Sequence, residues 1–577
     1  MDLRVSGTRP RIEPLAPRGR ALLLLLLVAA SALLVVEPGR VALFEPDEGR
    51  YAEIPREMIA SGDWVTPRLD GFPYFEKPPL HYWLVAASFE LFGQSEATSR
   101  LPIKAASLGM VLLTLVFARR RWGERVGILA ALVTASSLLV VAMARVNVID
   151  PPLSLALTGA AFSFCAFQEA ERAGNRARAT LALYGLHLSC AAAVMLKGLI
   201  GLVLPGGAIV VWALATGSLR LVPRLFSPGP LALFLVLTVP WHVLVARRNP
   251  GFLDFYFVNE HFKRFLSPGH RRSGSRFYFV GVLLAGLLPW TGFLGRIGLS
   301  FPGRGRTAWR DRATEGYLWS FSVLVFLFFT VSRSKLVPYI LPIWPALAVL
   351  LAIGIERARV RGAAFLADRR ITAGFYGLLL AGVLAAGYGG RYAERFGVEG
   401  PAALLVAALA LGFLLNLPWP FRGRPRPVAL STERLAVTTI VPWLLFLGGA
   451  VWALPTVARQ ITPWPLVKTL LAEARPGDLV FQRGAYLEVI PPYLGRLTPI
   501  VDLGWSELDF GRPEGQKKGL LPTPEEFARL WNGEGRVLAV VHFGHLASFT
   551  DPKLPLNRPI YLGQTPNGKY LLFANRS

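Results

Sequence analysis

The sequence predicts an all-α polytopic membrane protein with about thirteen transmembrane helices, followed by a small α/β or α+β domain. Of the 577 residues 53% are hydrophobic, the mean hydropathy is +0.44, and long charge-poor runs recur along most of the chain. After about residue 457 the pattern changes to short alternating stretches such as "GDLVFQ" and "RVLAVVHF", separated by turn signals. We therefore expect an N-terminal segment at 1–20, a membrane domain at 21–456 and a C-terminal domain at 457–577.

The expected helices are runs of about 16 to 21 apolar residues, which are long enough to cross a bilayer. The first run could instead be a signal peptide with "ASA" at 30–32 as its cleavage site. A retained first helix gives a consistent topology and is the interpretation we favour. The expected spans lie near 21–36, 102–118, 126–144, 151–168, 180–196, 198–215, 230–246, 278–297, 315–332, 337–355, 374–389, 401–417 and 436–456.

The distribution of charge sets the orientation. A net charge of +25 would suggest nucleic acid in a soluble chain, but here the arginines cluster in short connections between apolar runs, as cytoplasmic anchoring requires. We expect no nucleic-acid partner. With the N-terminus inside, the first outer loop is 37–101 and the C-terminal domain lies outside. The outer loop 247–276 is strongly basic against this rule, which suggests that it meets an anion. Both cysteines, Cys165 and Cys190, lie inside apolar runs, so neither a disulfide framework nor a Cys-based metal site is expected.

Charged residues gather on the predicted outer side. Asp47 and Glu48 follow the first span, Asp150 stands before two prolines at the start of the fourth, and Lys197 lies between the fifth and sixth. Ionisable residues at the edges of spans are functional candidates by default. The remaining candidates on this side are Arg50, Glu76, Lys77, Glu260, His261, Lys263, Arg264, Arg333, Lys335 and Tyr339.

Each of these residues also has a purely structural interpretation. Asp47 could cap a helix and Asp150 could begin one. Lys197 could reach the membrane surface from a tight turn beside Gly198. The stretch "FEKPPLHYW" could belong to an interfacial aromatic belt. Taken together, the residues are harder to explain in this way. A capping role accounts for one residue at a time and does not explain why a second carboxylate, a lysine and a basic loop lie on the same side.

Carboxylates and cations at the outer membrane surface, beside interfacial aromatic residues, suit a substrate with a lipid tail and a phosphate head. The cations would bind the phosphate and stabilise it as it leaves. A carboxylate could accept the proton of an incoming hydroxyl group or orient that group. The outer loops hold no glycine-rich phosphate cradle of the P-loop type, so no nucleotide is expected.

The stretch "DEGRYAEIPREMIASGDWVTPRLDGFPYFEKPPLHYW", 47–83, closely resembles the first outer loop of the bacterial lipid A aminoarabinose transferases. These enzymes belong to the polyprenyl-phosphate-dependent glycosyltransferases, which include the protein O-mannosyltransferases. Other stretches resemble the same family: "RVNVIDPPL", "MLKGLIGLVLP", "NEHFKRF", "SRSKLVPYILPIWPALA" and "LGWSELDFG".

The resemblance implies the third-class glycosyltransferase fold, a polyprenyl-phosphate sugar donor, and lipid A or another envelope acceptor on the outer face of a bacterial inner membrane. It implies that Asp47 is the main catalytic carboxylate and Asp150 a second acid, with Glu48 beside Asp47. Phosphate groups of the donor or acceptor would meet Arg50, Lys77, Lys197, Lys263, Arg264, Lys335 and Tyr339.

The resemblance also implies that Glu76 belongs to a divalent metal site, for Zn or Mg, although His81, His261 and His270 are only distant candidates for a partner. Pro55 departs from the family motif, and an interior proline should kink the helix that carries Glu57.

The sugar and the acceptor stay open at this stage. Transfer of another sugar, such as a hexose, to a glycan or protein fits the same residues. A polysaccharide polymerase or ligase and a lipid-sugar flippase or transporter are further alternatives. A transporter should carry intramembrane charges near the midplane, whereas these charges lie at one interface.

Overall fold

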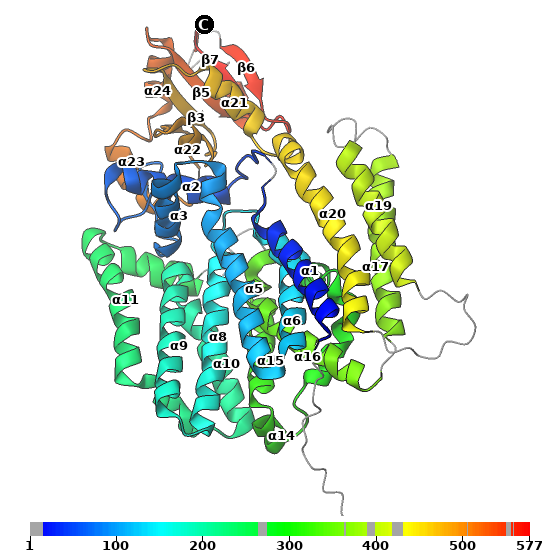
Figure 1. The fold of residues 1–577 in the computed structure, drawn as a ribbon. Helices are drawn as coiled ribbons and strands as arrows, with labels where there is room; N and C mark the ends of the chain where they lie inside the picture. The colour runs from blue at the N-terminus through cyan, green and yellow to red at the C-terminus, as the bar shows by residue number, and fades with distance from the viewer. Residues whose placement is uncertain are drawn as a thin grey trace, which may run out of the picture.

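The structure is a computed structural model in which a bundle of long helices supports a smaller region containing strands (Figure 1). Helices α2 (Asp47–Ser61) and α3 (Leu80–Phe92) lie between the bundle and that region. The structure describes residues 15–37, 39–263, 274–362, 365–388, 399–417, 431–504, 506–549, 556–557 and 559–576.

Within these ranges, eight helices are long and apolar enough to cross a membrane. The chain is thus a multi-pass membrane protein, as its composition predicts. The eight are α1 (Pro17–Val35), α5 (Leu101–Trp122), α8 (Asp150–Arg172), α9 (Arg176–Lys197), α11 (Pro228–Arg248), α15 (Ala313–Val331), the continuous η4 and α16 (Val337–Ile343 and Trp344–Val360), and α20 (Thr432–Ile461).

The other expected spans correspond to a bent pair of helices, a divided run and three further helices. Helices α13 (Tyr278–Gly286) and η3 (Trp290–Ser300) meet at 104° and could together form a ninth span. The predicted run 126–144 is divided at Ser137, which has an extended backbone, into α6 (Glu124–Ser136) and α7 (Leu138–Met143). The remaining expected spans overlap α10 (Ile200–Thr216), α17 (Leu366–Tyr388) and α19 (Glu399–Asn416). The count of thirteen therefore stays a prediction.

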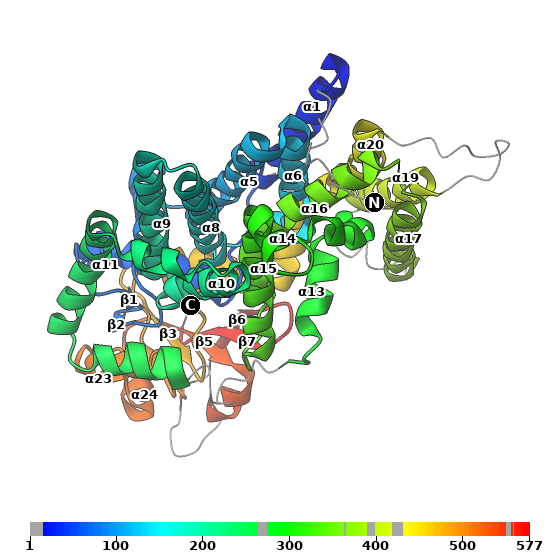
Figure 2. The ribbon, with the colours of Figure 1, turned by 90° about the horizontal axis from the view of Figure 1, so that it is seen from below.

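Helix α8 is central to the arrangement of the site. It packs against α9 and α5 on one side and against η4 and α15 on another. Seen from below, α9, α8 and α5 follow one another along one edge of the molecule (Figure 2). Short helices connect the bundle: η1 (Leu219–Phe226), η2 (Asp254–Lys263) and α14 (Arg306–Asp311).

The predicted first outer loop, 37–101, folds against the bundle rather than extending into solvent. After α2 come the two-residue antiparallel strands β1 (Arg68–Leu69) and β2 (Phe72–Pro73), then α3 and the short α4 (Glu96–Ser99). Ser95 caps α4 with its hydroxyl on the backbone N–H of Thr98, 3.2 Å away.

The region after α20 contains a five-stranded mixed sheet in the order β4-β3-β5-β7-β6. Strands β4 (Ile500–Val501), β3 (Leu479–Arg483) and β5 (Val537–His542) are parallel, whereas β7 (Tyr570–Ala574) and β6 (Ile560–Gln564) pair antiparallel. The helices of this region are α21 (Trp464–Glu473), α22 (Ile490–Leu494), η5 (Asp509–Gly511), α23 (Arg512–Lys517), α24 (Pro524–Asn532) and η6 (Phe543–Phe549).

The sheet changes direction beside β3, since the chain passes from β3 to β4 on one side and then to β5 on the other. In open sheets of this kind, functional residues tend to follow the carboxyl ends of the parallel strands. Here those ends lead to Glu488 after β3 and Glu507 after β4, and both carboxylates reach back to helix α2.

Candidate active site

Asp47 and Arg50 lie one turn apart at the start of α2. The nearest atoms, Asp47 Oδ1 and Arg50 Nη1, are 3.6 Å apart. The Asp47 side chain is 43% exposed, compared with 12% for Asp150 and 12% for Glu76. Asp47 is therefore the predicted acid that is most accessible to a substrate.

Asp150 and Lys197 form an ion pair across the ends of two neighbouring helices. Asp150 is the first residue of α8 and Lys197 is the last of α9, and Lys197 Nζ donates to Asp150 Oδ1 at 2.6 Å. The same ammonium lies 4.8 Å from the ring centroid of Tyr339 on η4. The structure thus joins three residues that are far apart in the sequence.

The charges of Asp47 and Asp150 both act on the hydroxyl group of Tyr51. Burial raises the pKa of this hydroxyl well above its usual value, and the nearby charges of Asp47 and Asp150 add to the rise. Asp47 and Asp150 consequently belong to one electrostatic environment.

Two further tyrosines lie in the same environment. Burial raises the pKa of the Tyr74 hydroxyl, which the Arg50 charge opposes and the Glu76 charge increases. The hydroxyls of Tyr74 and Tyr82 are buried and have no hydrogen-bond partner among the described residues. Buried polar groups without partners are unusual and often mark a functional site. Both tyrosines belong to the quoted motif, but nothing in the sequence pattern distinguishes them from its other aromatic residues.

Arg50 is held by carboxylates from the C-terminal region, which the sequence interpretation missed. Its guanidinium donates twice to Glu488, at 2.9 and 3.1 Å, and once to Glu507 at 2.5 Å. A phosphate here would meet three carboxylates, so these partners do not fit the predicted phosphate-binding role of Arg50. Arg50 instead links the exposed Asp47 to the sheet region. Glu507 lies in the stretch "LGWSELDFG", which resembles the family. That resemblance was the one sequence feature that could have identified Glu507 as a site residue.

The contact between α2 and the C-terminal region is very close at Gly49. A Cβ atom at this position would lie 2.4 Å from the carbonyl carbon of Glu488 and 2.6 Å from the nitrogen of Val489. Beside it, the carboxylate of Glu45 accepts the Val489 N–H at 2.7 Å. Burial raises the pKa of Glu45 to about 7, despite the lowering effects of backbone hydrogen bonds and Arg50.

Glu48 requires a correction. It is fully buried, and its two oxygens accept four hydrogen bonds from Arg100, Asn147 and Phe44, at 2.6 to 2.9 Å. A carboxylate with these partners fixes the loop against α5 and the start of α8 and does not reach a substrate. The sequence cannot distinguish it from Asp47, because adjacent residues on a helix point in different directions.

Lys335 also has a different environment from the one predicted. Its ammonium donates to the carbonyl oxygens of Phe329, Thr330 and Ser332, at 3.4, 2.8 and 3.0 Å. It therefore caps the carboxyl end of α15, where a cation is favoured. Of the predicted basic loop, Arg264 lies outside the described residues, and only the backbone of Lys263 is described, as the last residue of η2.

Lys77 and Glu76 lie together in the first outer loop. Lys77 Nζ is 2.8 Å from the carbonyl oxygen of Glu76 and 3.6 Å from its carboxylate. His81 is buried, bonds to Asn147 at 2.9 Å, and has its pKa lowered by burial to about 4. In the described part of the chain, no group of three or more His, Cys, Asp or Glu residues could hold a metal ion. The described residues around Glu76 therefore do not provide a set of metal ligands. The metal site at Glu76 stays an untested prediction.

The structural interpretations of the two acids differ in outcome. Asp150 begins α8, as its structural interpretation predicts, whereas Asp47 is the first residue of α2 and no side chain forms a hydrogen bond at the cap of that helix. Helix α2 continues through Pro55 to Ser61, and both carboxylate oxygens of Glu57 accept the N–H of Gly71, at 3.0 and 3.1 Å. Pro55 thus does not end the helix, and Glu57 points to the β1–β2 turn.

The chain is similar to a family model, to several curated enzymes and to solved structures. Residues 21–256 match the family model of dolichyl-phosphate-mannose-protein mannosyltransferases. The chain is 33% identical over 417 residues to the undecaprenyl phosphate-α-4-amino-4-deoxy-L-arabinose arabinosyl transferase of Edwardsiella ictaluri, covering 71% of this chain and 68% of the relative. For the enzyme of the same name from Aeromonas salmonicida, the identity is 34% over 421 residues, covering 72% and 73%. With the Erwinia tasmaniensis enzyme the match covers 60% of each chain.

The solved structures agree with these sequences. ArnT from Cupriavidus metallidurans bound to undecaprenyl phosphate superimposes with a TM-score of 0.81 at 27% identity, covering 97% of this chain and 99% of the other. The same protein in the apo state gives a TM-score of 0.79. The resemblance therefore extends over the bundle and the sheet region together.

Proposed function

Since the chain belongs to the undecaprenyl phosphate-α-4-amino-4-deoxy-L-arabinose arabinosyl transferase family, we propose that it transfers 4-amino-4-deoxy-L-arabinose from undecaprenyl phosphate to lipid A. It is a membrane glycosyltransferase that uses a polyprenyl-phosphate sugar as its donor. We further propose thirteen spans in a bacterial inner membrane, with the site and the C-terminal region on the periplasmic side. The excess of Lys and Arg in the opposite connections supports this orientation.

The observation that carries the proposal is an exposed carboxylate beside an ordered cationic site. Asp47 is 43% exposed, Asp150 holds Lys197 at 2.6 Å beside Tyr339, and the charges of both acids act on the Tyr51 hydroxyl. A donor phosphate beside Lys197 would gain charge-assisted contacts in a poorly hydrated environment, where they are strongest. Asp150 keeps the Lys197 ammonium oriented before the donor binds.

Transfer proceeds in one displacement. An oxygen of the acceptor phosphate forms a bond to the anomeric carbon, while the bond from that carbon to the lipid phosphate breaks and the polyprenyl phosphate leaves with the electron pair. The configuration at the anomeric carbon is inverted. A phosphate acceptor is already anionic near neutral pH, so Asp47 orients it or stabilises positive charge that develops on the sugar. With a hydroxyl acceptor, Asp47 would instead remove the proton.

The test is mass spectrometry of lipid A, envelope glycans and proteins from cells that make the wild-type chain, the Asp47→Asn variant or no protein. We expect one aminoarabinose increment on lipid A with the wild type and its absence in the other two strains. The matched control is Asp311→Asn, an exposed aspartate at the end of α14, which should keep the increment.

Two other results would change the proposal. An unchanged lipid A with a sugar missing from a glycan or protein would keep the chemistry and replace the acceptor. Full transfer by Asp47→Asn, at wild-type protein levels, would remove Asp47 from the mechanism.

A further inference from the structure

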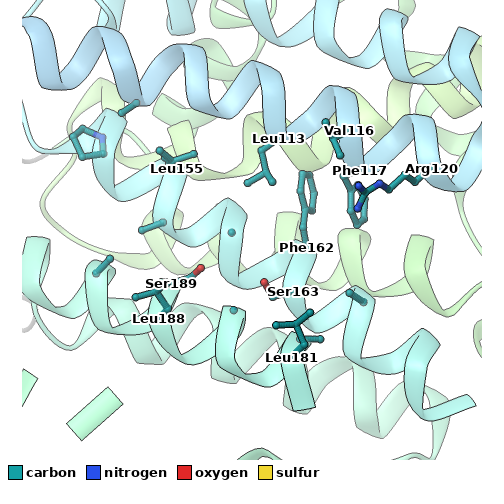
Figure 3. A pocket seen from close by; sticks show the side chains of 18 of the residues that line it. Leu113, Val116, Phe117, Arg120, Leu155, Phe162, Ser163, Leu181, Leu188 and Ser189 are labelled. Carbon is teal, nitrogen blue, oxygen red and sulfur yellow. The ribbon is translucent and has the colours of Figure 1, made fainter. Parts of the chain in front are cut away.

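A groove with a volume of about 1310 Å³ runs between α5, α8 and α9 (Figure 3). Its lining is apolar over most of its length, with side chains such as Leu113, Phe162 and Leu188. The groove opens at the protein surface, since Val116, Leu181 and Leu188 in its lining are 43%, 71% and 53% exposed.

The groove lies on the side of α8 away from the catalytic residues. Its lining residues on this helix recur every three or four positions, and Gly159 lies at the middle of the stripe. Gly159 is nine residues after Asp150, which is about two and a half helical turns, so the two positions face opposite directions. Lys197, the partner of Asp150, approaches Tyr339 on η4. None of the charged residues of the catalytic site lines the groove.

The charged part of the lining is confined to one end of the groove. Arg120 and Arg121 lie in the last turn of α5, Arg178 lies in the first turn of α9, and Glu169 lies in the last turn of α8. Arg121 pairs with Glu169 at 2.6 Å and lies 4.0 Å from the ring centroid of Phe117. Arg120 and Arg178 are exposed, and no carboxylate of the described chain lies within ion-pair distance of either. The end therefore carries two uncompensated positive charges.

The apolar wall starts next to these charges and continues along the three helices to Pro102, Pro152 and Leu196, so only its half next to the charges belongs to one membrane leaflet. Half of a hydrocarbon core is about 15 Å, which corresponds to about ten helical residues. Over that distance α5 presents Leu113, Val116 and Phe117, and α9 presents Leu181 and Leu188. The rings of Phe117 and Phe162 stack at 3.7 Å and close the wall between α5 and α8.

We propose that this groove binds one anionic phospholipid of the leaflet remote from the catalytic residues. The headgroup phosphate lies between Arg120 and Arg178, and the acyl chains lie along Leu113, Phe162 and Leu181. Charge complementarity selects an anionic headgroup, because basic pockets between helices at a membrane surface attract anionic lipids. The site is separate from the transferase site and does not depend on the identity of the transferred sugar.

The experiment measures lipid retention by the purified full-length protein with native mass spectrometry. Nanodiscs would contain equal amounts of phosphatidylglycerol and phosphatidylcholine with the same acyl chains. We expect the wild type to retain one phosphatidylglycerol with at least a tenfold preference, and Arg120→Ala/Arg178→Ala to lose this preference. Both arginines are exposed, so the double variant should fold, and size-exclusion chromatography would verify this.

The matched control is Arg172→Ala/Arg176→Ala. It removes the same charge from exposed positions on α8 and α9 that do not line the groove, and it should keep the preference. Equal loss in both double variants, or no preference in the wild type, would overturn the proposal. Adding undecaprenyl phosphate to the same nanodiscs provides a further arm. If it displaces phosphatidylglycerol from the wild type at equal concentration, the groove is a site for the polyprenyl lipid instead.

Discussion

Arg50 and Glu488 are separated by 438 residues in the sequence and joined by two hydrogen bonds of 2.9 and 3.1 Å. Glu488→Gln removes the charge of the main partner and leaves the buried guanidinium with Glu507 and the more distant Asp47. Breaking a buried pair costs about 3 kcal/mol, and a displaced Asp47 should lower kcat on the order of 10²-fold. Thermal unfolding and lipid A transfer by the purified protein measure the two effects. Glu473→Gln, whose partner Arg536 belongs to the same region, should change transfer little.

Gly49 makes the same contact sensitive to a single methyl group. In Gly49→Ala the new Cβ would collide with the backbone at Glu488 and Val489, and such overpacking costs about 1–3 kcal/mol. We expect a lower unfolding temperature and reduced transfer. The control is Gly448→Ala in α20, where a Cβ meets nothing within 4 Å. That variant should be as stable as the wild type or more stable, since alanine favours the helix.

The Asp150–Lys197 pair can be examined with a double-mutant cycle. Lys197→Met leaves the Asp150 carboxylate without its partner, so we expect a clear loss of stability and a higher KM for the polyprenyl donor. Adding Asp150→Asn should restore about 0.5–3 kcal/mol of stability, the usual coupling between contacting residues. Transfer should stay low in the double variant. If transfer recovers together with stability, the pair is only structural.

Glu45 predicts a pH dependence of stability. Its pKa is about 7 in the folded protein, against an ordinary value of 4.5. Between these values the folded state keeps a proton that the unfolded state has lost, so this contribution to stability is greatest below pH 4.5 and falls until about pH 7. Unfolding temperatures between pH 5 and 8 would show the slope, and Glu45→Gln should flatten it. An unchanged slope in the variant would assign the pH dependence to another group.

Lys335→Met separates a structural role from phosphate binding. The ammonium donates to three carbonyl oxygens at the end of α15, so its loss should lower the unfolding temperature. We expect the KM for the donor to stay within about twofold, because these donors are already engaged. A large rise in KM at unchanged stability would restore the phosphate-binding interpretation.

Apolar run length explains why most of the membrane part was predictable. The first run and the run at 102–118 became α1 and α5, because about 20 apolar residues can satisfy their backbone polar groups in a bilayer only as a helix. Hydropathy contains no information on the extended Ser137 or on the 104° bend before Trp290. Both breaks depend on packing against neighbouring helices.

The sequence predicts those site residues whose role follows from their position at the end of an apolar run. Asp47, Asp150 and Lys197 lie at helix ends, and the structure places them in one region. The different roles of Asp47 and Glu48 depend on which helix face is buried by Arg100 and Asn147, residues that are distant in sequence. Glu488 was missed because its function arises only when the sheet region docks on α2.

That docking also sets the order of events during biosynthesis. By the time that α16 has emerged from the ribosome, the chain already contains Asp47, Asp150, Lys197 and Tyr339, but Glu488 and Glu507, which accept the hydrogen bonds of Arg50, have not been translated. A nascent or prematurely terminated chain could therefore insert its early helices while remaining catalytically silent. Activity would appear only late in synthesis, after the strands that position Glu488 and Glu507 have folded against the first loop.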